Sequence, residues 1–336
     1  MEINGINLDD LDAEIPETLV PKEVPGRVLQ LDADALAYEC AAFDDDPFQQ
    51  CINNFKAAID SRLRMAGATF INLHLTGGDK GGRYDTALVK EYQGNRKDKV
   101  KPKHLAGLRE WIMGYYGSGV IAKAIMHEHQ EADDGMAQGN YKAIQEGHPE
   151  LSVIMSIDKD LTMCSGWHCD WNSYEMNYVD GFGEIHLDES TSTKKIKGFG
   201  TSFFWAQLLM GDGADSIPGL PKLGMPLLDE YDPLKKPRKE DAKPKACGAV
   251  MAWKMLKDVK TDLDAMLLVI KAYQSYYGTE SFSYVDWRGD AHNLTSGHMV
   301  LEQARLLWMR RVVDECPSVF FKQVTNDIKW DGEPNE

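Results

Sequence analysis

Short apolar runs alternate with amphipathic segments over the first half of the chain. Four runs have the length and composition of buried strands, and they cover 27–32, 68–76, 120–126 and 151–157. The segments between them have helical spacing, and they cover 35–42, 48–65, 105–116 and 136–144. This alternation predicts an α/β fold with a mostly parallel central sheet flanked by helices.

The second half of the chain reads as mainly helical. A β-rich stretch is expected within 170–196, and helices are expected at 202–210, 248–257, 263–277 and 298–313. A glycine-rich loop covers 211–224, and a stretch rich in Pro and Lys covers 233–245. The acidic, proline-containing segment 1–25 and the segment 321–336 are expected to be tails.

Composition changes this picture only slightly. The sequence has no run of 18 apolar residues and no apolar signal-peptide core, so we expect no membrane partner. Its six cysteines are scattered, which predicts free thiols and a cytoplasmic location. The segment 164–169 lacks the paired spacing of a zinc site, and we interpret it as structural. The net charge of −16 argues against a surface covered in basic residues but permits local basic patches.

Acidic residues follow all four predicted strands of the first half. The carboxyl ends of parallel strands meet at one edge of a sheet, where ligands bind in such folds. The glycine-rich loop adds two more carboxylates. The candidate site therefore contains Asp32, Asp79, Glu131, Asp133, Asp134, Asp158, Asp160, Asp212 and Asp215.

Nine carboxylates are enough to hold two hard divalent cations, which prefer oxygen ligands. Two ions about 3.5–4 Å apart can activate water and stabilise the leaving oxygen of a phosphodiester. Acidic residues at the start of a helix also complement its dipole, which is the simpler interpretation of the 131–134 cluster. A structural Ca²⁺ loop, a Ser-His-Asp arrangement, a Walker-type phosphate loop and a dinucleotide fingerprint are not visible.

A basic segment follows the second strand, from Lys80 to Lys103. Such a run is typical of a solvated loop. Tyr84 and Tyr92 interleave with its lysines and arginines, which is also typical of a surface that binds single-stranded nucleic acid through phosphates and stacked bases.

Six motifs in order make the chain resemble the 5′-nuclease superfamily, and within it the tailed-phage 5′→3′ exonucleases and flap endonucleases. The resemblance covers about 27–257, and weakly 302–307. Its motifs are Leu31-Asp32-Ala33-Asp34, Gly78-Asp79-Lys80-Gly81, Glu91-Tyr92-Gln93-Gly94-Asn95-Arg96, Glu131-Ala132-Asp133-Asp134, Ser156-Ile157-Asp158-Lys159-Asp160 and Gly211-Asp212…Asp215-Ser216-Ile217-Pro218-Gly219.

The resemblance implies roles for these residues. The catalytic metal site would use Asp32, Asp79, Glu131 and Asp133. The second metal site would use Asp158, Asp160, Asp212 and Asp215, with Asp134 assisting either site. A helical arch over 80–117 would admit a single-stranded 5′ end, and Arg96 would act in catalysis by binding phosphate. The implied DNA-binding residues are Lys80, Arg83, Lys90, Tyr92, Gln93, Arg96, Lys97, Lys222 and Lys245.

The resemblance also implies a domain plan. A tail at 1–25 would precede a metal-binding core at 26–200, a duplex-binding and C-terminal helical region at 201–320, and a tail at 321–336. The loop after Gly219 and the helix after Gly248 resemble a helix–three-turn–helix motif, which often carries K⁺.

Two departures from the family pattern stand out. Gln93 replaces the usual arch lysine, so Lys90 or Lys97 is expected to supply that charge. An insertion at 225–247 splits the duplex-binding motif.

The implied activity is a 5′→3′ exodeoxyribonuclease with 5′-flap endonuclease activity, using two Mg²⁺ or Mn²⁺ ions and releasing 5′-phosphate products. Its partners would be DNA with single-stranded 5′ ends, flaps or duplex ends, with RNA/DNA hybrids as a further candidate, and the chain is taken as a monomer. If the chain is phage-encoded, the expected location is the bacterial host cytoplasm. Three alternatives stay open: a PIN-type ribonuclease, a catalytically inactive structure-specific DNA-binding protein, and an acidic α/β protein whose carboxylates are merely solvated.

Overall fold

The structure is a computed structural model that describes residues 2–3, 6–7, 21–42, 44–97, 99–190, 192–220 and 247–325. Lys222, Lys245, most of the 225–247 insertion, most of the 1–25 segment and the last eleven positions, 326–336, lie outside the described residues. Within the N-terminal segment, β1 (Glu2–Ile3) pairs antiparallel with β2 (Ile6–Asn7).

The central sheet has six strands in the order β5-β4-β3-β6-β7-β8. All neighbouring strands are parallel except β7 and β8, which are antiparallel. The predicted mostly parallel sheet is therefore confirmed. Its strands are β3 (Val28–Asp32), β4 (Phe70–Thr76), β5 (Ala122–His127), β6 (Ser152–Met155), β7 (Gly166–Cys169) and β8 (Met176–Val179).

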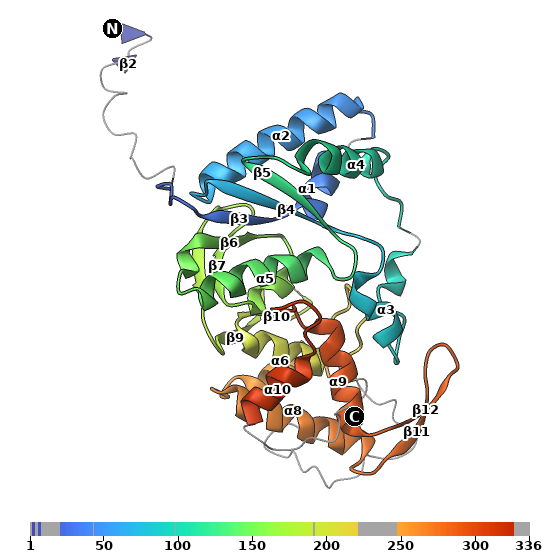
Figure 1. The fold of residues 1–336 in the computed structure, drawn as a ribbon. Helices are drawn as coiled ribbons and strands as arrows, with labels where there is room; N and C mark the ends of the chain where they lie inside the picture. The colour runs from blue at the N-terminus through green and yellow to red at the C-terminus, as the bar shows by residue number, and fades with distance from the viewer. Residues whose placement is uncertain are drawn as a thin grey trace.

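Helices cover both faces of the sheet (Figure 1). Three helices lie on one face: α1 (Ala33–Cys40), α2 (Phe48–Met65) and α4 (Leu105–Tyr116). Helix α2 has the predicted bounds, and it buries Ile52, Phe55 and Ile59 because they recur at helical spacing. Helix α5 (Ala132–Gln145) covers the other face, and the 3-10 turn η5 (Pro149–Leu151) leads from it into β6.

A polar row crosses the sheet beneath α5. His127 Nε2 lies 2.8 Å from His74 Nδ1, and His74 Nε2 lies 2.9 Å from Gln30 Oε1. Gly135 and Gly139 of α5 lie directly over this row. A Cβ at these glycines would lie 2.3 Å from the His127 ring and 2.5 Å from Gln30, so only glycine lets α5 approach the polar row.

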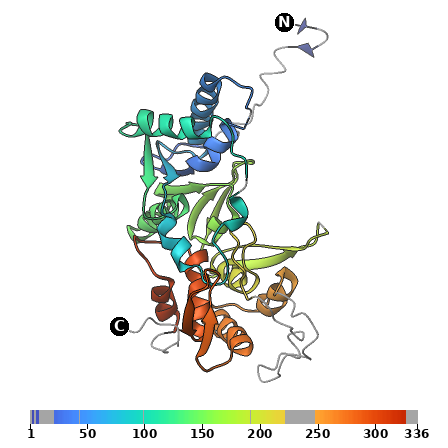
Figure 2. The same ribbon diagram turned by 90° about the vertical axis from the view of Figure 1, so that its right-hand side faces the viewer.

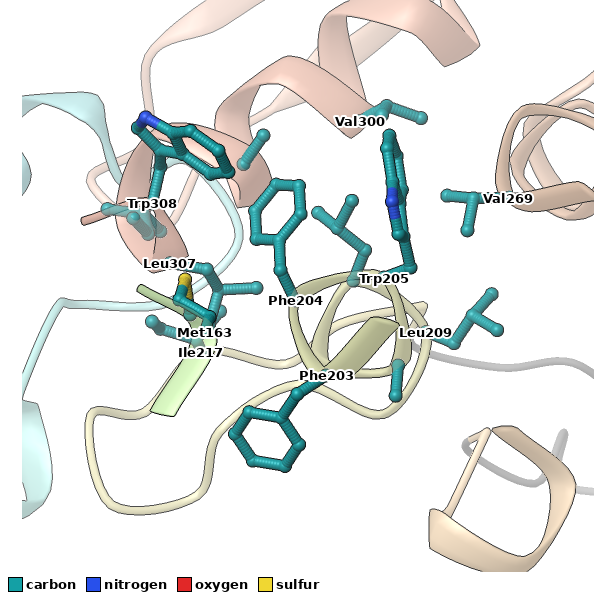
Figure 3. Packing of buried hydrophobic residues seen from close by; sticks show 14 of the residues in the cluster. Met163, Phe203, Phe204, Trp205, Leu209, Ile217, Val269, Val300, Leu307 and Trp308 are labelled. Atoms are coloured by element: carbon teal, nitrogen blue, oxygen red, sulfur yellow. The ribbon is translucent and has the colours of Figure 1, made fainter. Parts of the chain in front are cut away.

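The helical region after the sheet packs around α6 (Thr201–Met210), which is buried on nearly every side. Phe204 and Trp205 point from α6 toward Val300 and Trp308 (Figure 3). Trp205 also stacks on Phe321, with ring centroids 5.5 Å apart. The surrounding helices are α7 (Ala249–Leu256), α8 (Asp262–Tyr277), α9 (Ser296–Leu307) and α10 (Pro317–Thr325).

Three details of this region differ from expectation. Helix α9 ends at Leu307 rather than at residue 313, because Trp308 adopts extended backbone and stacks on Phe320 at 4.7 Å. Helix α10 occupies the beginning of the predicted 321–336 tail. The antiparallel pair β11 (Phe282–Val285) and β12 (Ala291–Leu294) was not predicted. No helix in the described ranges is long and apolar enough to cross a membrane.

The predicted arch segment contains only short helical pieces before α4. These are η3 (Lys80–Gly82), α3 (Arg83–Thr86) and η4 (Gly94–Arg96). Its middle part lies against the glycine-rich loop, where Gln93 N donates to Asp215 O at 2.8 Å and Asn95 Nδ2 donates to Gly213 O at 2.9 Å. The arch segment is thus docked on the loop that carries two candidate metal ligands.

Candidate metal centre

Local structure holds the acidic side chains at the carboxyl ends of β3 and β6. Asp32 caps the N-terminus of α1 by accepting from Ala35 N at 2.9 Å, and it also accepts from Ser156 Oγ at 2.8 Å. Asp158 caps η6 (Lys159–Met163) by accepting from Asp160 N at 2.8 Å. These hydrogen bonds orient the carboxylates of Asp32 and Asp158 without the help of a bound ion.

Six of the predicted acids line one cavity of about 630 Å³, which we call the acid pocket. They come from four separate segments: the end of β3, the start of α5, the loop after β6 and the glycine-rich loop. The residues are Asp32, Glu131, Asp133, Asp158, Asp212 and Asp215. The sequence prediction of convergence at one sheet edge is met for these six.

Burial and mutual repulsion favour the neutral form of several of these carboxyls. Burial, followed by the neighbouring charges of Asp34 and Asp158, raises the pKa of Asp32 to about 6. Burial, followed by the charges of Asp158 and Asp32, raises the pKa of Asp133 well above its ordinary value. Burial and the charge of Asp158 raise the pKa of Asp160 to about 8. A cation bound among these groups would remove that repulsion.

Protein cations lie among the acids. Lys80 Nζ lies 3.3 Å from Glu131 Oε1, and Arg96 forms an ion pair with Asp215. Lys159 Nζ lies 2.6 Å from Asp160 Oδ1 and 3.1 Å from Asp212 Oδ2. Burial opposes ionisation of Asp212, but the charge of Lys159 together with hydrogen bonds from Lys159, Asp160 and Ala214 N outweighs burial and lowers the pKa of Asp212. Sequence reasoning gave Lys159 no role, although its place between Asp158 and Asp160 was a signal.

One group of acids has the spacing of a metal site. Carboxylate oxygens of Asp160, Asp212 and Asp215 lie within 4.8 Å of one another. Asp160 is buried, and it accepts from Gln207 Nε2 at 2.7 Å, which orients its carboxylate. Three oxygen ligands at this spacing suit Mg²⁺ or Mn²⁺.

Asp79 does not join the acid pocket. Its half-exposed carboxylate accepts from Gly82 N at 2.9 Å and lies 3.4 Å from His129 Nδ1. It lines a different cavity, of about 490 Å³, together with Arg310 and other C-terminal residues. The expected convergence fails here because Asp79 turns away to cap η3 after Gly77 and Gly78.

Asp134 is a structural residue here rather than an open ligand. It has no exposed surface and accepts from Arg83 Nη1 at 2.9 Å and Arg83 Nη2 at 3.0 Å. It also accepts from the backbone N–H groups of Glu131 and Arg310. These four donors fill both oxygens, which corrects the expectation of a metal ligand. Arg83 is only 1% exposed, so its predicted contact with DNA is also corrected.

Two residues of the arch segment donate hydrogen bonds to the acidic side chains. Tyr92 is 2% exposed, and its hydroxyl donates to Glu131 Oε2 at 3.0 Å. Its ring therefore does not offer a stacking face to DNA, contrary to the sequence prediction. Gln93 donates to Asp215 Oδ1 at 3.0 Å and accepts from Lys80 Nζ at 2.6 Å. Lys80 is thus the cation beside Gln93.

The predicted substitutes for the arch lysine lie elsewhere. Lys90 and Lys97 do not line the acid pocket, and Lys97 Nζ lies 2.6 Å from Glu91 Oε1. Arg109 and Asp34, which had no predicted role, do line it, with Arg109 Nε 3.1 Å from Asp34 Oδ1. The position of Asp34 two residues after Asp32 was the available signal.

Comparison with known proteins supports the fold. No protein-family model and no curated protein matches this sequence. The structure is similar to a bacteriophage T5 5′-exonuclease with bound zinc, with a TM-score of 0.51 and 13% identity over 89% of this chain and 98% of that chain.

Two further structures from bacteriophage T5 are more distant. The D15 protein co-crystallized with metal ions has a TM-score of 0.43 and 16% identity over 74% of this chain and 93% of that chain. A D15 flap endonuclease pseudo-enzyme-product complex with DNA and metal ions has a TM-score of 0.44 and 15% identity over the same shares of the two chains, 74% and 93%. The comparison of folds therefore rests on the first structure, and it confirms the predicted fold alone, an α/β fold with a mostly parallel central sheet.

Proposed function

We propose that this protein is a divalent-metal-dependent 5′-nuclease that hydrolyses DNA. The observation that carries the proposal is the acid pocket, where carboxylates from four segments meet with Lys80 and Arg96 at the edge of the sheet. The comparison with T5 5′-exonuclease supports the same assignment through its fold. The specific activity that we propose is that of a 5′→3′ exodeoxyribonuclease that also has 5′-flap endonuclease activity.

The donor set fits two Mg²⁺ or Mn²⁺ ions. One group of ligands would be Asp32, Glu131 and Asp133, and the other would be Asp158, Asp160, Asp212 and Asp215. When bound, the ions supply an activated water and stabilise the leaving oxygen. The raised pKa values of Asp32, Asp133 and Asp160 support cation binding, because ionising all three together without a cation is unfavourable.

The chain itself would position the phosphodiester. Arg96 and Lys80 line the acid pocket, where they now pair with Asp215 and Glu131. The phosphate would replace these carboxylates as the partner of the two cations. Hydrolysis would join the water oxygen to phosphorus and break the bond to the 3′ oxygen, which takes up a proton. The products would carry a 5′-phosphate and a 3′-hydroxyl. Lys101 and Arg109 at the rim would extend the positive surface for the 5′ strand.

The duplex-binding part of the proposal rests on α7 and the loop before it. Gly219 N donates to Gln303 Oε1 at 2.8 Å, which fixes the described end of that loop. Lys222 and Lys245 lie outside the described residues, and so does most of the loop whose backbone is expected to hold K⁺. Their roles stay predictions from the sequence resemblance.

A PIN-type ribonuclease is the second candidate, because it would share the acidic sheet edge. A 5′-flap DNA duplex and a single-stranded RNA, each incubated with and without Mg²⁺, separate the two. Mg²⁺-dependent cleavage near the flap junction supports the 5′-nuclease, and RNA cleavage alone supports the rival. Absence of all hydrolysis supports an inactive DNA-binding protein.

The variant that tests the mechanism is Asp133→Asn. Its matched control is Asp45→Asn, because Asp45 is exposed. We expect Asp133→Asn to lower the cleavage rate by orders of magnitude, while Asp45→Asn cleaves as the unchanged protein does. Full cleavage in the presence of chelator would refute the mechanism.

A further inference from the structure

A second cavity, of about 330 Å³, adjoins the acid pocket, and we call it the edge cavity. Asp158 lines both cavities, so whatever fills the edge cavity lies next to the proposed metal ligands. Ser156, which donates to Asp32, also lines it. The edge cavity is therefore connected to the site where the phosphodiester would be cut, but the proposed chemistry does not use it.

One wall of the edge cavity is the face of the sheet. Ile154, His168 and Asn177 lie side by side on β6, β7 and β8, because the strand register pairs Ile154 with His168 and His168 with Asn177. Side chains opposite one another in neighbouring strands share a face. All three residues line the cavity, which gives this wall an apolar part and two polar groups.

The polar groups of this wall are available to a ligand. His168 Nε2 donates to Cys164 O at 2.8 Å, so its Nδ1 is left as an acceptor. Burial lowers the pKa of His168, which favours this neutral form. Within the described part of the chain, the amide of Asn177 has no hydrogen-bond partner, and it offers both donors and an acceptor.

The opposite wall is formed by β10 (Lys195–Phe199), which pairs with β9 (Glu184–Asp188). Phe199 lines the cavity and is 37% exposed. Lys195 and Lys197 share its face of the strand, since Ile196 between them is buried in the core. Figure 2 shows this yellow-green hairpin extending away from the body of the protein.

Hydrogen bonds join this wall to η6. Gly200 N donates to Thr162 O at 2.9 Å, and Thr162 Oγ1 lies 2.6 Å from Lys159 O and 2.9 Å from Gly198 O, either of which can accept its proton. Thr162 belongs to η6, which also carries Asp160. The strand that carries Phe199 is therefore joined by hydrogen bonds to the short helix that carries Asp160.

We propose that the edge cavity binds one unstacked base of the DNA strand whose phosphodiester lies in the acid pocket; this rests on the proposed nuclease function. Its volume lies within the range of about 300–1,000 Å³ for small-ligand pockets. Phe199 would stack on the base, and Asn177 and His168 would bond its edge. Lys195 would attract the phosphates beside that base, whereas Lys197 already pairs with Asp188, its Nζ 2.7 Å from Asp188 Oδ2.

The test uses 5′-flap duplexes that carry 2-aminopurine at one of the two nucleotides on either side of the junction, with Ca²⁺ replacing Mg²⁺ during binding. A base that leaves the DNA stack changes its 2-aminopurine fluorescence, so one position should change when the unchanged protein binds and should change less with Phe199→Ala. Phe48→Ala is the matched control, because Phe48 is 36% exposed and lines neither cavity.

Cleavage kinetics with Mg²⁺ complete the test. We expect Phe199→Ala to raise KM about tenfold, given the usual cost of losing one stacked base, with a smaller rise for Asn177→Ala. If Phe199→Ala does not fold, Asn177→Ala carries the test. The base-binding proposal is overturned, and the proposed nuclease function is kept, if the unchanged protein cleaves and both cavity variants have the same fluorescence and KM as the unchanged protein. Absence of Mg²⁺-dependent cleavage by the unchanged protein overturns the proposed function, and this proposal falls with it.

Discussion

Lys159 Nζ lies 2.6 Å from Asp160 Oδ1 and also reaches Asp212, at 3.1 Å. The ammonium therefore lies between two members of the only three-carboxylate group with metal-site spacing among the described residues. A cation entering this group would compete with Lys159 for the same oxygens.

We predict that Lys159→Met lowers the melting temperature without metal, because Asp160 and Asp212 lose their counter-charge. Added Mg²⁺ or Mn²⁺ should then raise the melting temperature by more than it does in the unchanged protein. Lys142→Met is the control, since Lys142 makes an exposed pair 3.8 Å from Glu146. Equal metal-dependent shifts in Lys159→Met and the unchanged protein would contradict the competition.

Lys80 should matter more to turnover than the other arch lysines. It contacts both Gln93 and Glu131 inside the acid pocket, whereas Lys90 and Lys97 do not line it. We predict that Lys80→Ala lowers kcat by about a hundredfold to a thousandfold, the usual cost of removing one group that stabilises charge developing in the transition state. Lys90→Ala and Lys97→Ala should stay within a few-fold of the unchanged protein. Single-turnover cleavage of a flap substrate measures this, and a larger effect at Lys90 would reverse the ranking.

The buried pair Arg83–Asp134 should dominate local stability. Removing one partner leaves the other charge buried without compensation, which costs about 3–5 kcal/mol. We therefore predict that Arg83→Met lowers the free energy of unfolding in urea by about that amount. Arg64→Met on the surface of α2 is the control. A loss below about 1 kcal/mol would mean that water reaches Asp134 in the folded protein.

The His74–His127 row should make stability depend on pH. Burial, followed by the charge of His127, lowers the pKa of His74 from 6.5 to about 3. His74 Nε2 donates to Gln30 and its Nδ1 accepts from His127, so protonating His74 would place two N–H groups face to face. This contribution to stability is present above pH 6.5 and is lost as pH falls from 6.5 toward 3.

The measurement is the melting temperature from pH 8 to pH 5 for the unchanged protein and for His74→Asn. The raised pKa values of Asp32 and Asp160 act in the opposite direction, so the difference between the two proteins is the useful quantity. We expect the advantage of the unchanged protein to shrink at low pH. A constant difference would exclude His74 as the cause.

The sequence by itself determined the layout of the fold and which acids come together at one edge of the sheet, with Asp79 as an exception. Helical spacing gave α2 its correct bounds, and alternating strands and helices predicted the parallel sheet. Because parallel strands end at one edge, Asp32, Asp133 and Asp158 could be placed together without coordinates. These inferences depend on local pattern and chain direction, which the sequence contains.

Tertiary structure decided which polar side chains line the acid pocket and which are buried elsewhere against a partner. Arg83 was predicted to meet DNA, but it bonds Asp134, 51 positions away, and Trp308 O, 225 positions away. Asp79 follows its strand as the other acids do, yet the turn after Gly77 and Gly78 directs it to another cavity. A charged side chain is stable in solvent or against a buried partner, and which of these occurs depends on distant segments that no local pattern identifies.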